Sequence, residues 1–280
     1  ITVGAAGTTT TLAGMAIASE NNSIFISDSD IMDTTDTAAF DTVVGWTAGN
    51  ALTTGDSNTF MGYAAGGAVT TGSFNIMIGA DAGDGFDTET NNLGIGNGSL
   101  GGSIAGGEYN VSIGNYSLDA LTSGDNNVAI GYNAGTAATT AAGNVLIGAY
   151  VTQTGVFTGG NNVVIGKLAG NDMTSADANV IIGEDAGANL TTADNSILIG
   201  QGAGEALTTG ADNIFIGQAA GDGHDAETNN LGIGRSALGG SINGGEYNVA
   251  VGNYTLDALT SGDHNVAIGY GAGTDLTEGG

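Results

Sequence analysis

The stretch NNVAIGYNAG, residues 126–135, decides the fold of this chain. It reads as an asparagine pair, three alternating apolar residues, a glycine, two variable residues and Ala-Gly. The same phrase returns as NNVVIGKLAG at residues 161–170, NSILIGQGAG at 195–204 and HNVAIGYGAG at 264–273. The rest of the chain is this phrase repeated and joined by turns, so repetition is the first property to explain.

The glycine that closes each phrase recurs from Gly45 to Gly269 at a nearly fixed period. The step is 17 residues, lengthened to 18 three times, and 280 residues hold fourteen such copies. A unit this short cannot hold a helical hairpin, and its apolar residues recur every second position, as they do in strands. The sequence therefore predicts an all-β chain, a parallel β-solenoid (β-roll) of 17–18-residue coils with no helical domain.

Two levels of organisation follow from the repeat. Residues 41–280 form the solenoid, and residues 75–136 match residues 213–274 at an offset of 138, which indicates an eight-coil super-repeat. Residues 1–40 hold one degenerate coil, NSIFIS, at 22–27. We interpret them as an N-terminal cap that protects the first edge strand, with a strand that links subunits as the alternative.

Four positions of each coil are expected to face inward. They are the residues three and one before the glycine, mostly Val, Leu or Ile, the Ala three after it and the Leu seven after it. The residue four before the glycine predicts a stacked asparagine ladder at a corner, in which each amide bonds its neighbours above and below. The ladder residues are Asn58, Asn75, Asn92, Asn110, Asn127, Asn144, Asn162, Asn179, Asn213, Asn230, Asn248 and Asn265.

The residue two before the glycine is expected to face outward. Five successive coils carry a large apolar residue there: Leu146, Val164, Ile181, Leu198 and Phe215. A stripe of this kind is a large exposed patch on a monomer, which predicts that it is buried against another copy of the chain. The expected partner is therefore the chain itself, as a trimer or as a filament.

The amino-acid composition and net charge exclude several classes of function. The chain has 2 Lys+Arg against 29 Asp+Glu, a net charge of −27, and no Cys or Pro. Phosphate backbones require cationic partners, so nucleic acid is excluded as a partner. No apolar run is long enough to insert into a membrane. His224 and His264 are replaced by Phe86 and Asn126 in the matching copies, which predicts two surface histidines and no enzyme.

Metal binding is the one ligand chemistry that the pattern offers. Asp84, Asp87 and Glu89 surround a glycine-bearing turn, and Asp222, Asp225 and Glu227 repeat the arrangement. Carboxylate oxygens are the ligands that Ca²⁺ prefers, so these two turns are candidate calcium sites, with a solvated acidic turn as the alternative.

The phrases NVAIGYNAG and NVAIGYGAG resemble the head repeats of YadA-like trimeric autotransporter adhesins, and also repeats of phage tail-fibre-like proteins. The resemblance covers about residues 41–280, with a longer period here than in the adhesin heads. It implies an extracellular, cell-surface or virion appendage: an adhesin or fibre shaft, trimeric, that attaches to a cell-surface or matrix receptor. A self-assembling filament joined by N-terminal strand addition is one alternative. Ice binding through Thr-Thr pairs such as Thr53-Thr54 is another.

Overall fold

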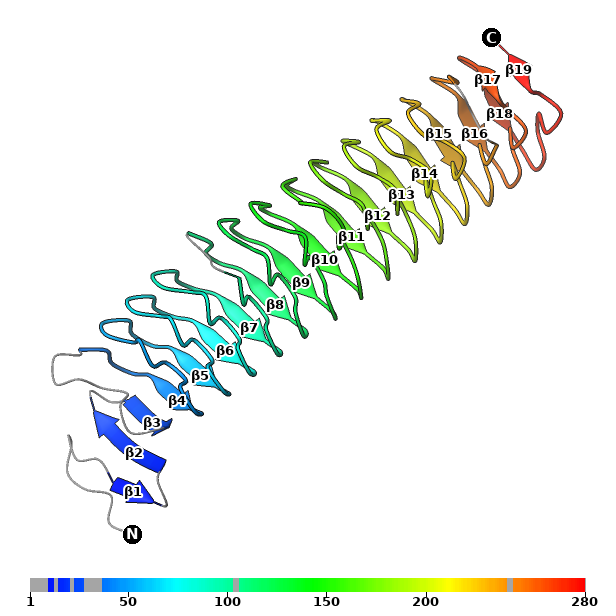
Figure 1. Ribbon diagram of the computed structural model, residues 1–280. Helices are drawn as coiled ribbons and strands as arrows, with labels where there is room; N and C mark the ends of the chain where they lie inside the picture. Colours follow the sequence, from blue (N-terminus) through cyan, green and yellow to red (C-terminus); the bar gives the residue numbers. More distant parts are fainter. Residues whose placement is uncertain are drawn as a thin grey trace. The chain divides into compact units, whose positions relative to one another are not determined.

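The chain is an all-β parallel solenoid of about fourteen coils, as the computed structural model shows (Figure 1). The structure describes residues 10–12, 15–20, 23–27, 37–102, 106–240 and 244–279. These residues contain no helix, and therefore none that is long and apolar enough to cross a membrane. The predicted fold class is confirmed.

The chain divides into two compact units, Ile1–Ala141 and Ala142–Gly280, called the N-terminal and C-terminal units below. The strands of the N-terminal unit are β1 (Thr10–Leu12), β2 (Met15–Glu20), β3 (Ser23–Ser27), β4 (Thr42–Val44), β5 (Thr59–Met61), β6 (Ile76–Ile78), β7 (Leu93–Ile95), β8 (Val111–Ile113) and β9 (Val128–Ile130). Those of the C-terminal unit are β10 (Val145–Ile147), β11 (Val163–Ile165), β12 (Val180–Ile182), β13 (Ile197–Ile199), β14 (Ile214–Ile216), β15 (Leu231–Ile233), β16 (Val249–Val251), β17 (Ser261–Gly262), β18 (Val266–Ile268) and β19 (Glu278–Gly279).

Each unit is built by in-register parallel pairing of equivalent residues. In the N-terminal unit β3 to β9 pair in order, so that Phe60 lies beside Met77. In the C-terminal unit β10 to β16 and then β18 do the same, with Leu198 beside Phe215. A second, short pairing joins β17 to β19. The sheet forms one wall of each coil, and turns complete the circuit.

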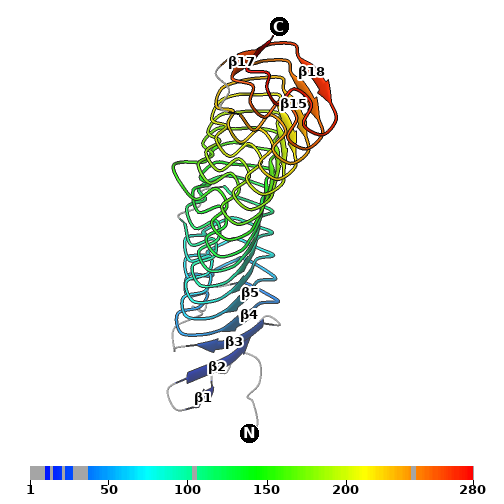
Figure 2. The same cartoon turned by 90° about the vertical axis from the view of Figure 1, so that its right-hand side faces the viewer.

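The N-terminal strands change direction. β2 pairs antiparallel with β3, and β1 pairs antiparallel with β2 (Figure 2). β3 also pairs with β4 in the register expected of the degenerate coil, with Ile24 beside Thr42. β2 occupies the free edge of β3 within the same chain. The cap and the subunit-linking strand both stay predictions, and residues 1–9, 13–14, 21–22 and 28–36 of this region lie outside the described residues.

In the structure the core lies on the opposite face of the strands from the one predicted. The residue two before the closing glycine, here the strand-centre column, is buried in both units: Phe60, Met77, Leu146, Val164, Ile181, Leu198 and Phe215 are 0% exposed. The predicted interface of Leu146, Val164, Ile181, Leu198 and Phe215 is therefore wrong, because these side chains fill the core of their own coils. Successive strand residues point to opposite faces, so the residues three and one before the glycine face outward.

Other inward predictions are confirmed. The alanines three after the glycine, such as Ala65 and Ala186, are fully buried. The leucine column seven after it is buried as well, at Leu52, Leu121, Leu190, Leu207 and Leu259. The core therefore runs between the inner face of the sheet and these two columns on the opposite wall.

Core volume is balanced between the strand-centre column and the residue four after the glycine. Most large strand-centre residues are paired with a glycine, as in Phe60 with Gly66 and Phe215 with Gly221. Four small ones are paired with a leucine, as in Gly232 with Leu238, although Ala129 and Ala267 are paired with glycine. A Cβ on Gly66 would lie 2.6 Å from the Phe60 ring. In the coils with a large residue or a leucine, the two positions thus share one volume, as close packing requires.

The closing glycines let neighbouring coils approach. Gly62 has φ +143°, and a Cβ there would lie 2.3 Å from the carbonyl oxygen of Gly79 in the next coil. No other residue fits that separation, because only glycine lacks a Cβ. This close approach is why the glycine recurs in every coil of the phrase.

Candidate functional site

The asparagine ladder is confirmed, and its side chains are buried within the coil. The backbone N–H of each rung donates to the side-chain oxygen of the rung before: Asn75 to Asn58 at 3.0 Å in the N-terminal unit, and Asn179 to Asn162 at 2.9 Å in the C-terminal unit. Each Nδ2 donates to a carbonyl of the next coil, as Asn179 does to Ala193 at 2.8 Å. The rungs from Asn58 to Asn248 are 0–1% exposed.

Two rungs of the ladder are not asparagine. Ser196 takes the place between Asn179 and Asn213, and its Oγ accepts the N–H of Asn213 at 3.2 Å. Asp41 takes the place before Asn58, whose N–H donates to Asp41 Oδ1 at 2.7 Å. Asp41 is buried, and burial raises the pKa of its carboxyl to about 6, against the opposing hydrogen bonds from Asn58.

We expect Asp41→Asn to stabilise the N-terminal unit at neutral pH. The folded pKa lies above the usual 3.8, so ionisation of Asp41 disfavours the folded state above about pH 6, and that cost disappears as the pH falls toward 3.8. The variant should gain on the order of 1–3 kcal/mol at pH 7 and much less at pH 4. Fluorescence of Trp46, the only tryptophan, reports this unit during denaturation. An equal effect at both pH values would contradict the assignment.

The predicted calcium ligands are held apart. Glu89 Oε2 accepts the N–H groups of Asp87 and Thr88, and its Oε1 accepts that of Gly106 at 2.9 Å. Glu227 repeats this with Asp225, Ala226 and Gly244 in the C-terminal unit. Each glutamate therefore stabilises its turn by accepting hydrogen bonds from backbone N–H groups. Within the described residues no three His, Cys, Asp or Glu side chains gather as a metal would need.

The remaining carboxylates of these turns are used differently. Asp87 and Asp225 accept hydrogen bonds from the hydroxyls of Thr70 and Thr208 in the preceding coils. Asp84 and Asp222 are partly buried, and desolvation raises the pKa of both. We therefore correct the calcium prediction. The carboxylates of these turns accept hydrogen bonds that hold the turn and connect neighbouring coils, and within the described residues their oxygens do not gather around one metal position.

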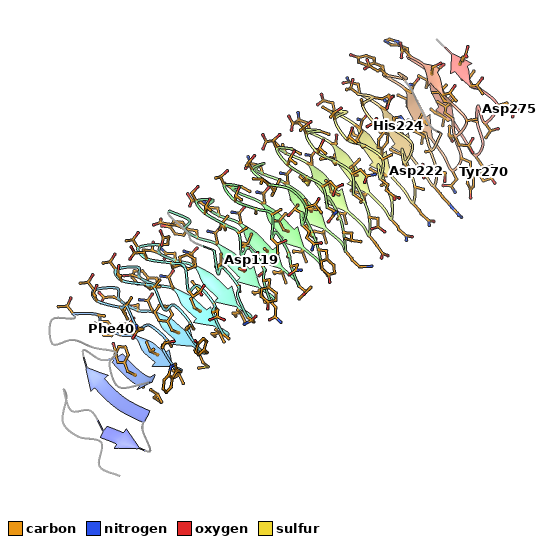
Figure 3. The ribbon with its side chains drawn as sticks, in the orientation of Figure 1. Phe40, Asp119, Asp222, His224, Tyr270 and Asp275 are labelled. Atoms are coloured by element: carbon orange, nitrogen blue, oxygen red, sulfur yellow. The ribbon has the colours of Figure 1, made fainter. Side chains whose placement is uncertain are left out.

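His224 is not a surface residue, contrary to the sequence-based prediction. It occupies the leucine column, is fully buried, and its ring centroid lies 4.8 Å from that of Phe215 (Figure 3). Neither ring nitrogen has a hydrogen-bond partner. Desolvation lowers the pKa of His224 to about 4, although Glu227 opposes the shift. His264 is exposed, as predicted, and stacks on Tyr247.

Replacing His224 with phenylalanine, the residue at the matching position 86, should stabilise the C-terminal unit. The folded pKa lies below the usual 6.5, so the unfolded chain binds a proton first and wild-type stability falls between about pH 6.5 and 4. H224F should remove that loss of stability, which amounts to about 3 kcal/mol between pH 6.5 and 4. It should also remove the cost of burying two unpaired ring nitrogens. Denaturation midpoints at pH 7 and 5 test this, with His264→Asn as the control. If the stability of H224F still falls between pH 7 and 5, a group other than His224 causes that pH dependence.

The surface most suited to contact a partner is the outward face of the sheet. We define the outer columns as the residues three and one before the closing glycine. They are (Thr42, Val44), (Thr59, Met61), (Ile76, Ile78), (Leu93, Ile95), (Val111, Ile113) and (Val128, Ile130) in the N-terminal unit. In the C-terminal unit they are (Val145, Ile147), (Val163, Ile165), (Val180, Ile182), (Ile197, Ile199), (Ile214, Ile216), (Leu231, Ile233), (Val249, Val251) and (Val266, Ile268).

These side chains are covered only by their neighbours along the sheet. Ile76 is 41% exposed, and Val266 and Ile268 of β18 are 70% and 72% exposed. Most of the others are half-buried, which is the exposure expected when branched side chains stack side by side without a second layer. The outer columns therefore form a continuous apolar surface along the described strands of the C-terminal unit, and from β6 to β9 in the N-terminal unit, where Thr42 and Thr59 precede it.

Aromatic residues border the outer columns. Trp46, Tyr63, Tyr132 and Tyr270 follow the closing glycine directly, and all four are exposed. On the other border, five residues before the glycine, Phe40 and Phe74 are exposed with φ near +60°. A bulky residue in the left-handed region is uncommon and costs about 1–2 kcal/mol. The backbone thus holds aromatic rings outward at a site where smaller residues would be easier to accommodate.

No protein-family model, curated protein or solved structure matches this chain. The class that the fold defines is therefore a parallel β-solenoid repeat protein with a polar internal ladder and an apolar outer sheet face.

Proposed function

We propose that this chain is a structural β-solenoid, the extracellular shaft of a fibre or adhesin that mediates surface attachment or assembly. The observation that carries the proposal is the repetition of one coil geometry: equivalent residues pair strand to strand and the ladder rungs bond coil to coil. Such a scaffold presents its surface residues at a constant spacing. The resemblance of its phrases to adhesin-head and tail-fibre repeats supports the extracellular setting.

The proposed role needs no catalysis. The chain has one lysine, one arginine and two histidines. His224 is enclosed in the core and His264 stacks on Tyr247, so neither is placed beside a nucleophile that it could activate. The partner that the proposal does require is a receptor on a cell surface or in a matrix.

Electron microscopy of the native material, with antibodies against the chain, tests the proposed function. We expect label on a short shaft that projects from a cell or virion. Label on long fibres would favour the filament alternative, and label confined to the cell interior would contradict the proposal. β2 is already paired with β3, so a linking role would have to use the outer edge of β1 or residues before it.

Ice binding is less favoured by the geometry. The hydroxyls of Thr53, Thr122 and Thr191 donate to carbonyl oxygens of the next coil at 2.9–3.0 Å. These hydroxyls are used as donors between coils, and the acidic residues Asp87 and Asp225 interrupt the column, so the threonines do not form a regular array. Measurement of thermal hysteresis would decide this alternative directly.

A further inference from the structure

We infer that the outward face of the sheet is the surface on which a second copy of this chain docks, through the outer columns and their aromatic borders. This inference rests on the proposed function and deepens it. It names a second copy of the chain as the partner with which one solenoid builds a shaft. It replaces the strand-centre column as the interface.

Charge separates this face from the rest of the molecule. None of the outer-column residues of β4 to β16 and β18 is charged, although the chain carries 29 acidic residues. Two copies with a net charge of −27 each repel one another, and the repulsion is smallest where no carboxylate lies between them. The outer columns, which are free of acids, thus offer a surface on which like chains can meet with little repulsion.

The two cations of the chain lie at the border of this same face. Lys167 and Arg235 both follow a closing glycine directly. Lys167 Nζ lies 3.4 Å from Glu184 Oε1, and Arg235 lies over the Tyr254 ring at 5.7 Å. Glu184 also follows a closing glycine, so Lys167 neutralises an acid on this border and Arg235 adds one positive charge there. The two cations thus offset negative potential at the edge of the proposed interface.

Spacing favours a copy of the chain over an unrelated partner. Parallel strands recur about every 4.8 Å, and the outer columns place two branched side chains at each step. A partner must present apolar groups at the same spacing over many strands to fill the gaps between them. A second copy does so by construction, and dry interdigitation of this kind is known to hold stacked sheets together.

The area of each face is that of an apolar patch with a function. Eight strands of the C-terminal unit, about 4.8 Å apart and three residues of about 3.3 Å wide, present roughly 400 Å². The six strands of the N-terminal unit present about 300 Å² on the same reckoning. Each value lies in the range of about 300–600 Å² in which the largest apolar patch of a monomer often has a function. Exposed aromatics at the border, such as Trp46 and Tyr63, are typical of such contacts.

The test is the mass of the full chain in solution. Sedimentation equilibrium at 0.15 M salt should give a multiple of the 27.2 kDa chain mass. The pair Ile165→Lys and Ile199→Lys places charge on the outer columns of two alternate coils, and we expect it to return the mass to 27.2 kDa. The matched control is Ser175→Lys with Thr209→Lys. It adds the same charge to exposed positions of the same two coils, outside the sheet, and should leave the complex intact.

Three outcomes overturn the inference. They are a wild type that sediments as a monomer at every concentration, an outer-column variant that stays associated, and a control pair that dissociates equally. Circular dichroism of each variant shows whether the coils are still folded. If the lysine pair unfolds the chain, Val163→Thr with Ile197→Thr replaces it, since Thr42 and Thr59 already occupy this column, and a loss of association is again expected. A monomeric wild type still found on surface shafts would leave the proposed function standing.

Discussion

Asn179→Ala should destabilise the C-terminal unit by about 3–5 kcal/mol. The side chain of Asn179 accepts the N–H of Ser196 at 2.8 Å and donates to the carbonyl of Ala193 at 2.8 Å. Alanine leaves both backbone groups buried and unpaired, at about 1–3 kcal/mol each, and opens a small cavity. Chemical denaturation followed by circular dichroism measures the loss.

The ladder itself supplies a graded control. Asn179→Ser keeps an acceptor for the next rung, as Ser196 does natively for Asn213, and should lose about half as much stability. Asn189→Ala in the same coil removes an exposed amide and should change stability by less than about 0.5 kcal/mol. Equal effects at Asn179 and Asn189 would show that the ladder contributes no more than a surface amide does.

Phe215 and Gly221 should show strong energetic coupling. Gly221→Leu places a Cβ 2.4 Å from the Phe215 ring, at a residue with φ +61°, and we expect a loss of about 3–5 kcal/mol. Phe215→Gly empties the centre of the coil and should cost about 4–5 kcal/mol. The double variant should cost less than about 3 kcal/mol, because leucine then fills the space that the ring has left.

The neighbouring coils justify this expectation. Gly232 with Leu238 and Ala250 with Leu256 already carry the exchanged combination, and both leucines are buried at φ +53°. A double-mutant cycle measured by chemical denaturation gives the coupling directly. A double variant as unstable as the sum of the two single variants would show that the two positions do not share one volume.

The repeat made the fold predictable from the sequence, but it left the two faces of the strand ambiguous. In a coil such as VII at β12, all three strand residues are apolar, so a period of two fits either face. From spacing alone, the apolar pair three and one before the glycine is predicted to face the core. The structure shows the opposite, and one reversal moved the predicted interface from the strand-centre column to the outer columns.

A clue to the correct face was present in the asparagine column. Asn162 and Val164 are two residues apart, so they must share a face. If the ladder is internal, the strand-centre column is internal too. The ladder was predicted at a corner, where it fixes no face. Its burial could be recognised only once the carbonyls that its Nδ2 groups reach, such as that of Ala176, were placed within the coil.

For the candidate sites too, the sequence identified the residues but not their burial or their hydrogen-bond partners. The acidic turns were identifiable by composition, but only the folded turn shows that Glu89 and Glu227 spend their oxygens on backbone N–H groups. His224 was assigned to the surface because its matching residue is Phe86. That exchange instead indicated a buried aromatic site, since both residues lie in the leucine column and are 0% exposed.

The sequence by itself determined the coil length, the parallel class and the residues that form the ladder, because each of these follows from spacing along the chain. The tertiary structure decided which strand face is the core. That choice depends on the opposite wall: the ring of Phe215 needs a glycine across from it, and only closure of the coil brings Phe215 against Gly221. Once that face is filled, the outer columns are left to the solvent or to a second copy of the chain.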